Sequence, residues 1–220
     1  MAGVRTTRRK RAGGGRSGVG SKKSKRAAVR MLPRARVAGA VAVMAAPAGT
    51  ARFAAGKALA VTAERDPARV YPHFEAIAGL IDSASKVVRW NALQILGWLG
   101  PVDEAGRIAG VLDKYLGVIQ EGNLISAANA IAGAGRIAVD QPELTERIVP
   151  ALLGVERARY ATAECRNVAI GHVLTALEGM WARVGDQRAV RVFVKRQVKN
   201  PRPAVARQAV RLVAAGFCRQ

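Results

Sequence analysis

Cysteine and histidine, which form disulfides and bind metals, are scarce in this sequence. The two cysteines, Cys165 and Cys218, have no CxxC spacing, which argues against a disulfide scaffold or a zinc site and favours a reducing compartment. The two histidines, His73 and His172, stand roughly 100 residues apart and do not form a ligand pair; His172 is expected to be a core or groove residue. No HExxH, GxSxG or glycine-rich phosphate loop occurs. The sequence therefore predicts no metal, no cofactor and no catalytic residue.

Aromatic residues are also rare, at 5%, whereas 50% of the 220 residues are hydrophobic, chiefly Val, Ala, Leu and Ile. Strand-like alternation between hairpin turns is missing, so the composition favours an all-α chain with one substantial core. Acidic residues are absent from residues 1–36, which hold 13 Lys or Arg. Residues 37–182 hold 13 basic and 14 acidic residues, and residues 183–220 hold 10 basic residues and one acidic residue. The net charge of +21 is therefore concentrated at the two ends.

Residues 1–36 are predicted to be a disordered basic tail, because Gly, Ser and like charges bury too little surface to fold. The tail lacks aromatic residues, so contact with a polyanion would involve phosphates without base recognition. The alternative is a solubilising, solvated tail. The residues predicted to contact a polyanion are Arg8, Arg9, Lys10, Arg11, Lys22, Lys23, Lys25 and Arg26.

The apolar run at 37–49, VAGAVAVMAAPAG, is too short for a membrane span of about 20 residues. We interpret it as a weak first helix that covers one end of the fold. A signal peptide or a transit peptide is the alternative interpretation, because an arginine-rich leader precedes the run.

One helical pattern recurs five times along the rest of the chain. Ala55, Ala92, Ala130, Val168 and Ala209 take the same place in it, at steps of 37, 38, 38 and 41 residues. A period near 40 residues is typical of stacked helix pairs. We expect the second helix of each pair at 51–63, 86–100, 124–139, 164–177 and 204–217. Amphipathic stretches at 71–81, 103–119, 143–155 and 186–198 supply the first helices.

The clearest copy of the pattern is V-R-x-x-A-x-x-x-L-G, formed by Val88, Arg89, Ala92, Leu96 and Gly97. Together with the period, it resembles the HEAT-repeat family over roughly residues 50–217. The resemblance implies a right-handed α-solenoid of about four to five helix pairs, here assigned to residues 37–220. It also implies that the second helices line a concave face that binds a protein partner.

Two columns of polar residues recur on those helices. An asparagine column forms either a ladder between repeats or a ligand-binding row. An arginine column makes the concave face basic or pairs with acids of adjoining repeats. The predicted partner-binding residues are Arg52, Arg89, Asn91, Asn129, Arg136, Arg166, Asn167 and Arg207.

The last repeat carries a second cationic cluster. We interpret it as a polyanion-binding patch, and the alternative is a solvated end cap. Arg188, Arg191 and Lys195 are three and four residues apart and share a helix face. The residues predicted to bind a polyanion are Arg188, Arg191, Lys195, Arg196, Lys199 and Arg202.

The sequence therefore predicts a non-catalytic scaffold or adaptor, cytoplasmic or nucleoid-associated unless the N-terminal segment is a targeting signal, and not a membrane protein. Non-specific association with DNA or RNA is the alternative function. A third hypothesis comes from a resemblance in size and architecture to the alkylation-repeat DNA glycosylases, which hold a damaged base with aromatic residues and an acid. The candidates for those roles are Trp90, Trp98, Trp181, Asp113 and Glu164.

Overall fold

The computed structural model describes residue 3 and residues 29–217. Within these residues the chain forms ten α-helices joined by short turns, and it contains no strand, so the predicted all-α class is confirmed. The helices are α1 (Arg34–Ala45), α2 (Ala51–Arg65), α3 (Phe74–Gly79), α4 (Lys86–Leu96), α5 (Arg107–Gly117), α6 (Leu124–Asp140), α7 (Thr145–Leu153), α8 (Ala163–Met180), α9 (Gln187–Gln197) and α10 (Pro203–Leu212).

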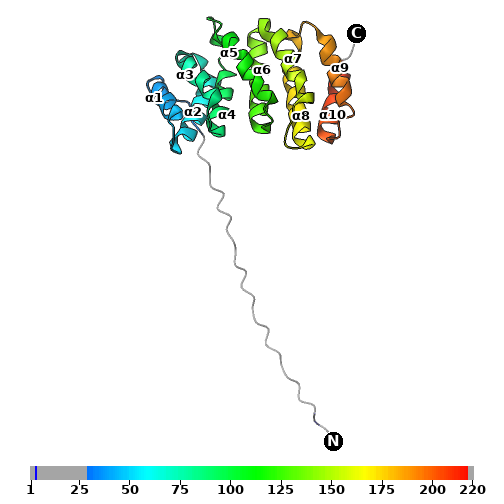
Figure 1. Cartoon of the computed structure of the whole chain (residues 1–220), viewed down its shortest axis with the longest axis horizontal. Helices are drawn as coiled ribbons and strands as arrows, with labels where there is room; N and C mark the ends of the chain where they lie inside the picture. Colours follow the sequence, from blue (N-terminus) through cyan, green and yellow to red (C-terminus); the bar gives the residue numbers. More distant parts are fainter. Residues whose placement is uncertain (1–2, 4–28, 218–220) are drawn as a thin grey trace.

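The helices form two layers (Figure 1). The even-numbered helices pack on one another in chain order: α2 on α4, α4 on α6, α6 on α8, and α8 on α10. The odd-numbered helices form the other layer, in which α1 contacts α3, α5 contacts α7, and α7 contacts α9. Four odd-numbered helices also contact the even-numbered helix that follows them: α1 with α2, α3 with α4, α5 with α6, and α9 with α10. Helix α8 packs on the 3-10 turn Gly154–Arg157 that continues α7, so the helices are arranged as successive pairs.

Polar contacts in the described part of the chain link neighbouring pairs. Side-chain hydrogen bonds that reach beyond a local turn join positions 22 to 41 residues apart. The bond from the Trp90 indole to Ser126 Oγ spans 36 residues, and the bond from Gln94 to Asn129 spans 35. Among residues 29–217 no such bond skips a pair, so each pair is held by the pair before it and the pair after it.

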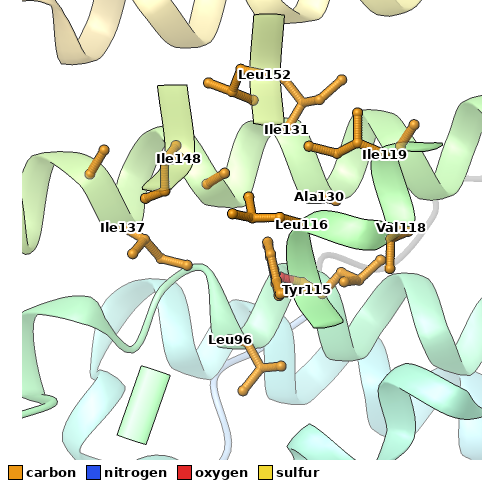
Figure 2. Close-up of a cluster of buried hydrophobic side chains, with 14 of the residues drawn as sticks. Leu96, Tyr115, Leu116, Val118, Ile119, Ala130, Ile131, Ile137, Ile148 and Leu152 are labelled. Carbon is orange, nitrogen blue, oxygen red and sulfur yellow. The ribbon is translucent and has the colours of Figure 1, made fainter. Parts of the chain in front are cut away.

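The core fills the space between the two layers (Figure 2). Leu96 of α4, Tyr115 of α5, Ile131 of α6 and Ile148 of α7 are each at most 1% exposed. Burial of such side chains contributes roughly 1.5–3 kcal/mol each before the entropy of ordering is counted. The apolar periodicity that predicted the helices is therefore the pattern that closes the core.

Small residues set the spacing of the even-numbered helices. A Cβ atom on Gly97 would lie 2.6 Å from the Cα atom of Gly133, so α4 and α6 approach each other at a point where neither carries a side chain. The Tyr115 hydroxyl passes close to Gly133 and donates to the Leu93 carbonyl oxygen at 2.8 Å. Ala92 and Ala130, two of the repeated positions, are fully buried. The small residues of the repeat therefore allow close helix packing.

Side-chain caps begin several helices. Thr162 accepts a hydrogen bond from the Cys165 backbone N–H at 3.0 Å and begins α8. Asn123 accepts from the Ser126 N–H at 3.0 Å and begins α6. Gly122, just before Asn123, has φ 83°, and a Cβ atom there would lie 2.6 Å from a backbone carbonyl oxygen, so this turn requires glycine.

The N-terminal boundary of the fold differs from the predicted boundary at residue 37. Helix α1 begins at Arg34 and buries Val37, Val41 and Met44, so the apolar run is helical up to Ala45. The backbone of Leu32 is held as well, because its N–H donates to Thr62 Oγ1 at 2.9 Å. The predicted polyanion contacts from Arg8 to Arg11 and from Lys22 to Arg26 lie outside the described residues, as does Cys218.

Candidate functional site

A groove of about 640 Å³ crosses the layer of even-numbered helices. Its walls come from Glu64 of α2, Trp98 after α4, Arg136 of α6 and His172 of α8. Because α2 and α8 are separated by α4 and α6, their sharing of one cavity means that this face of the layer is hollowed. We call this cavity the main groove.

Two smaller hollows extend the main groove toward both ends of the chain. A hollow of about 270 Å³ between α2 and α4 shares Glu64 and Trp98 with the main groove. Another, of about 240 Å³ between α8 and α10, shares His172 and Thr175 with it. Four steps between five helices, at about 10 Å per step, give a path of roughly 40 Å from α2 to α10.

The groove exists because small residues occupy the C-terminal halves of α6 and α8. Ala132, Gly135, Ala176 and Gly179 line it. At its base a Cβ atom on Gly135 would lie 3.0 Å from the Ala176 Cβ, so the helices are in contact there. At Gly179 a Cβ atom would meet nothing within 4 Å. The helices therefore touch at the floor of the groove and leave space above it.

Arg136 is the charged residue best fixed in the groove. Its guanidinium carbon lies 4.1 Å from the centroid of the Trp98 ring, a cation–π distance, and its Nε donates to the Gly97 carbonyl oxygen at 3.3 Å. Burial lowers the pKa of Arg136, and the nearby Tyr115, Glu64 and Asp140 oppose that change. No carboxylate among residues 29–217 lies within 4.0 Å of this guanidinium, so it keeps donor capacity for a ligand.

The other polar residues of the groove provide acceptors and a neutral imidazole. Burial raises the pKa of Asp140, and the positive charge of Arg136 partly counters it. Burial lowers the pKa of His172, so its imidazole is neutral at pH 7. His172 lines the groove, which is one of the two positions expected for it from the sequence. In the part of the chain that the structure describes, no three His, Cys, Asp or Glu side chains group as a metal site requires.

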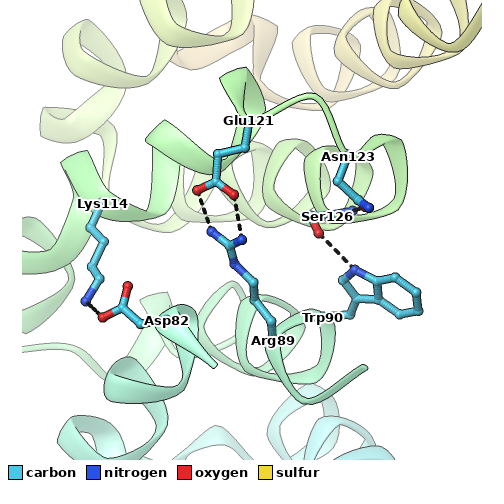
Figure 3. Close-up of polar contacts among 7 residues, drawn as sticks. All are labelled: Asp82, Arg89, Trp90, Lys114, Glu121, Asn123 and Ser126. Atoms are coloured by element: carbon cyan, nitrogen blue, oxygen red, sulfur yellow. Dashed lines mark hydrogen bonds and ion pairs between the residues drawn. The ribbon is translucent and has the colours of Figure 1, made fainter. Parts of the chain in front are cut away.

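The predicted arginine column lies largely outside the groove. Arg52, Arg89, Arg166 and Arg207 occupy the first two turns of the even-numbered helices, whereas the groove runs over their later turns. The Arg89 guanidinium donates to both carboxylate oxygens of Glu121 at 2.5 Å, a bidentate ion pair between α4 and the turn before α6 (Figure 3). For Arg89, the structure therefore agrees with the alternative interpretation of the arginine column, in which each arginine pairs with an acid of an adjoining repeat.

The asparagine column links neighbouring elements without forming an Asn–Asn ladder. Asn129 accepts from Gln94 Nε2 at 2.7 Å and donates to the Ile125 carbonyl oxygen at 2.8 Å. Asn167 accepts from Asn200 Nδ2 at 3.3 Å. Asn91 is 6% exposed, and its Nδ2 has no hydrogen-bond partner among the described residues. None of the three asparagines lines the main groove or its two extensions.

The acids and the indoles considered for a glycosylase do not come together. Asp113 pairs with Arg147 in the odd-numbered layer, and Glu164 pairs with Arg202 at the start of α8. Figure 3 shows the Trp90 indole donating to Ser126 Oγ, at 2.9 Å. The Trp181 ring stacks on Phe217, with centroids 4.1 Å apart, so only Trp98 of the three indoles lines the groove.

The groove carboxylates Glu64 and Asp140 were not predicted from the sequence. No motif marks them, but each stands two or three residues before the proline that follows its helix, Pro67 or Pro142. An acid at that place in two repeats is the signal that could have identified them. It alone would not have shown that both face one cavity.

Comparisons with known proteins agree with the helical architecture and add no functional assignment. No protein-family model and no curated protein sequence matches this chain. The crystal structure of an engineered protein, Northeast Structural Genomics Consortium target OR329, is similar with a TM-score of 0.53. The sequence identity is 15%, and the match covers 83% of this chain and 83% of that chain, so the likeness concerns the fold. Across the described residues, no helix has the length and apolar character needed to cross a membrane.

Proposed function

We propose that the chain is a HEAT-like repeat protein, a right-handed α-solenoid of five helix pairs. The repeated positions Ala55, Ala92, Ala130, Val168 and Ala209 each lie on an even-numbered helix, and those helices pack in chain order. Hydrogen bonds that reach one pair away and no further support a nearest-neighbour architecture of this kind. A stack of this type presents one continuous face to a ligand.

The proposed function is that of a non-catalytic scaffold that binds an extended segment of a protein partner in the main groove. The groove is the observation that carries this proposal, because it is hollowed and is floored by small apolar residues. A path of roughly 40 Å accommodates about 12 residues of extended chain at about 3.3 Å per residue. The Arg136 guanidinium would donate to peptide carbonyl groups, and the Glu64 and Asp140 carboxylates would accept from peptide N–H groups.

The test is to fill the groove without disturbing the helices. Gly179→Leu adds a side chain where a Cβ atom meets nothing within 4 Å, and it replaces a helical glycine, so the fold should be retained or stabilised by about 0.5–1 kcal/mol. Gly110→Leu is the matched control, because Gly110 also has nothing within 4 Å and lies on α5 in the other layer. Selection from a display library of 12-residue segments would supply the peptide ligand.

Binding of the selected peptide would then be measured by fluorescence anisotropy. We expect Gly179→Leu to weaken binding at least roughly tenfold, the effect of losing about 1.4 kcal/mol, while Gly110→Leu leaves it unchanged. Equal binding by both variants would show that the peptide lies elsewhere. Failure of the wild-type chain to select any segment would argue against the scaffold function itself.

A further inference from the structure

The turns that precede α8 and α10 lie on one edge of the molecule and carry an excess of cations. Arg157 and Arg159 are exposed in the turn after α7, Lys195 is exposed in the last turn of α9, and Lys199 is exposed in the turn after α9. Arg166, in the first turn of α8, is half-buried. We call these five residues the cationic edge. It is distinct from the main groove, which runs over the later turns of α2, α6 and α8, although the extension between α8 and α10 reaches Arg202 beside this edge.

The two glutamates on this edge are already neutralised by other arginines. Glu156 accepts from Arg196 Nε at 3.1 Å and from Arg196 Nη2 at 2.5 Å. Glu164 forms an ion pair with Arg202. Within residues 29–217 no carboxylate lies within 4.0 Å of the charged group of any cationic-edge residue. Five positive charges on the last two helix pairs are therefore left uncompensated.

Contacts between these pairs bring the chain neighbours of four of the five cations together, and Arg159 follows Arg157 by two residues. Arg157 follows Glu156 in the chain and Lys195 precedes Arg196, so the Glu156–Arg196 ion pair brings these two cations close together. The Asn200–Asn167 hydrogen bond, at 3.3 Å, brings together the neighbours of Lys199 and Arg166. The charges thus form one surface that spans two pairs, about 10 Å apart in this kind of packing.

We propose that the cationic edge binds the phosphate backbone of a nucleic acid duplex. A duplex presents one negative charge per 1.7 Å of axis, so about six charges lie within a 10 Å step. Arginine guanidinium groups can form bidentate hydrogen bonds with phosphate oxygens, and lysine ammonium groups can form ion pairs with them. The aromatic residue of this edge, Tyr160, is half-buried, with its hydroxyl bonded to the Ile119 carbonyl oxygen at 2.8 Å, so it offers no exposed ring for base stacking. Binding is therefore independent of base sequence.

The experiment compares two triple variants of the full chain that lose equal charge. The edge variant carries Arg157→Gln, Arg159→Gln and Lys199→Gln. The control carries three substitutions near the opposite ends of the even-numbered helices, at exposed positions without an ion pair among the described residues: Arg65→Gln, Arg183→Gln and Arg188→Gln. Because Arg188 was also predicted to bind a polyanion, the control separates the two locations. Thermal melts first establish that both variants fold as the wild type does.

Affinity for a random-sequence duplex of about 20 base pairs is measured by fluorescence anisotropy across an NaCl series. Each phosphate contact contributes about 0.9 to the slope of log K against log salt, so the edge variant should lose about 2–3 from that slope. At 100 mM NaCl it should bind at least roughly tenfold more weakly than the wild type, and the control should stay within about twofold.

Three results would overturn the proposal. Equal weakening of both variants would mean that only net charge matters, and unchanged binding by the edge variant would place the contacts elsewhere. Binding to vesicles that contain phosphatidylserine, without binding to the duplex, would assign the edge to a lipid surface instead. The groove proposal is unaffected by any of these results, because peptide binding is measured separately.

Discussion

Asp103 offers a sharp test of how the helix pairs are joined. This carboxylate is 6% exposed and lies in the turn before α5. Its oxygens accept from the backbone N–H groups of Arg107 at 2.9 Å and Ile108 at 2.8 Å. They also accept from the Tyr71 hydroxyl at 2.6 Å, from the pair before, and from Gln141 Nε2 at 3.1 Å, from the pair after. One side chain therefore begins α5 and joins three successive pairs.

We expect Asp103→Ala to lower the free energy of unfolding by about 3–5 kcal/mol. A hydrogen bond to a charged group contributes about 1.5–3 kcal/mol, and four such bonds to one carboxylate do not add fully. The change also leaves the buried N–H of Ile108 without a partner, whereas Gln141 Nε2 keeps its hydrogen bond to the Gly100 carbonyl oxygen. Asp103→Asn keeps the shape and one acceptor oxygen, so a smaller cost of about 1–3 kcal/mol is expected.

The pH dependence provides a second measure of the same site. Burial raises the pKa of Asp103, but the hydrogen bonds from Tyr71, Ile108, Gln141 and Arg107 outweigh burial and hold it below its ordinary value. A lowered folded-state pKa means that the stabilisation is present above the unfolded-state pKa, about 4, and is lost as the pH falls through the lower folded-state value. The Asn variant lacks this component, so its stability should depend less on pH below about 4.

Urea denaturation followed by circular dichroism at 222 nm, at pH 7 and in the acid range, measures these effects. Glu104→Gln is the matched control, because Glu104 is the exposed neighbour of Asp103, and its substitution should change the free energy of unfolding by less than about 0.5 kcal/mol. A decrease of less than about 1 kcal/mol in the free energy of unfolding for Asp103→Ala would refute the reasoning, since the loss of four hydrogen bonds to a buried carboxylate should destabilise the fold by more than that.

Two further substitutions test the packing between α4 and α6. Gly133→Ala should destabilise the fold by more than about 2 kcal/mol, because the new Cβ atom would lie 1.8 Å from the Tyr115 hydroxyl oxygen. A urea denaturation curve that matches that of the wild type would contradict the close approach. Asn129→Leu should cost about 1 kcal/mol, since it removes the bonds to Gln94 and Ile125 at a half-buried position, and a neutral effect in urea would show that these bonds are replaced by water.

Much of the fold was predictable because the apolar periodicity of a helix can be recognised within a single short segment of sequence. The predicted segment 124–139 corresponds to α6 at Leu124–Asp140, and the predicted segment 164–177 lies within α8 at Ala163–Met180. The segment 71–81 is less regular than predicted. It divides into 3-10 turns at Tyr71–His73 and Leu80–Asp82 around the short helix α3. Pro72 accounts for the irregular start, because it lacks an N–H group and restricts the residue before it.

The candidate site was predicted only in part. Arg136 was expected on the binding face and lines the main groove, and His172 was expected in the core or a groove. The groove acids Glu64 and Asp140 were missed, because their meeting depends on how α2 and α6 are placed. The arginines of the first turns, such as Arg89, were expected on the same face, but the groove opens over the opposite ends of the helices.

The sequence by itself determined the helices, because helix formation depends on neighbours within a few turns. The repeat period and the excess of positive charge can be counted directly in the sequence. Tertiary structure decided which charges remain available. Arg196 is paired with Glu156, 40 residues earlier, whereas Lys199, only three residues after Arg196, is exposed and lacks an ion pair among the described residues. An ion pair requires two groups within about 4 Å, and only the packing of one helix pair on the next brings residues so distant in the chain to that separation.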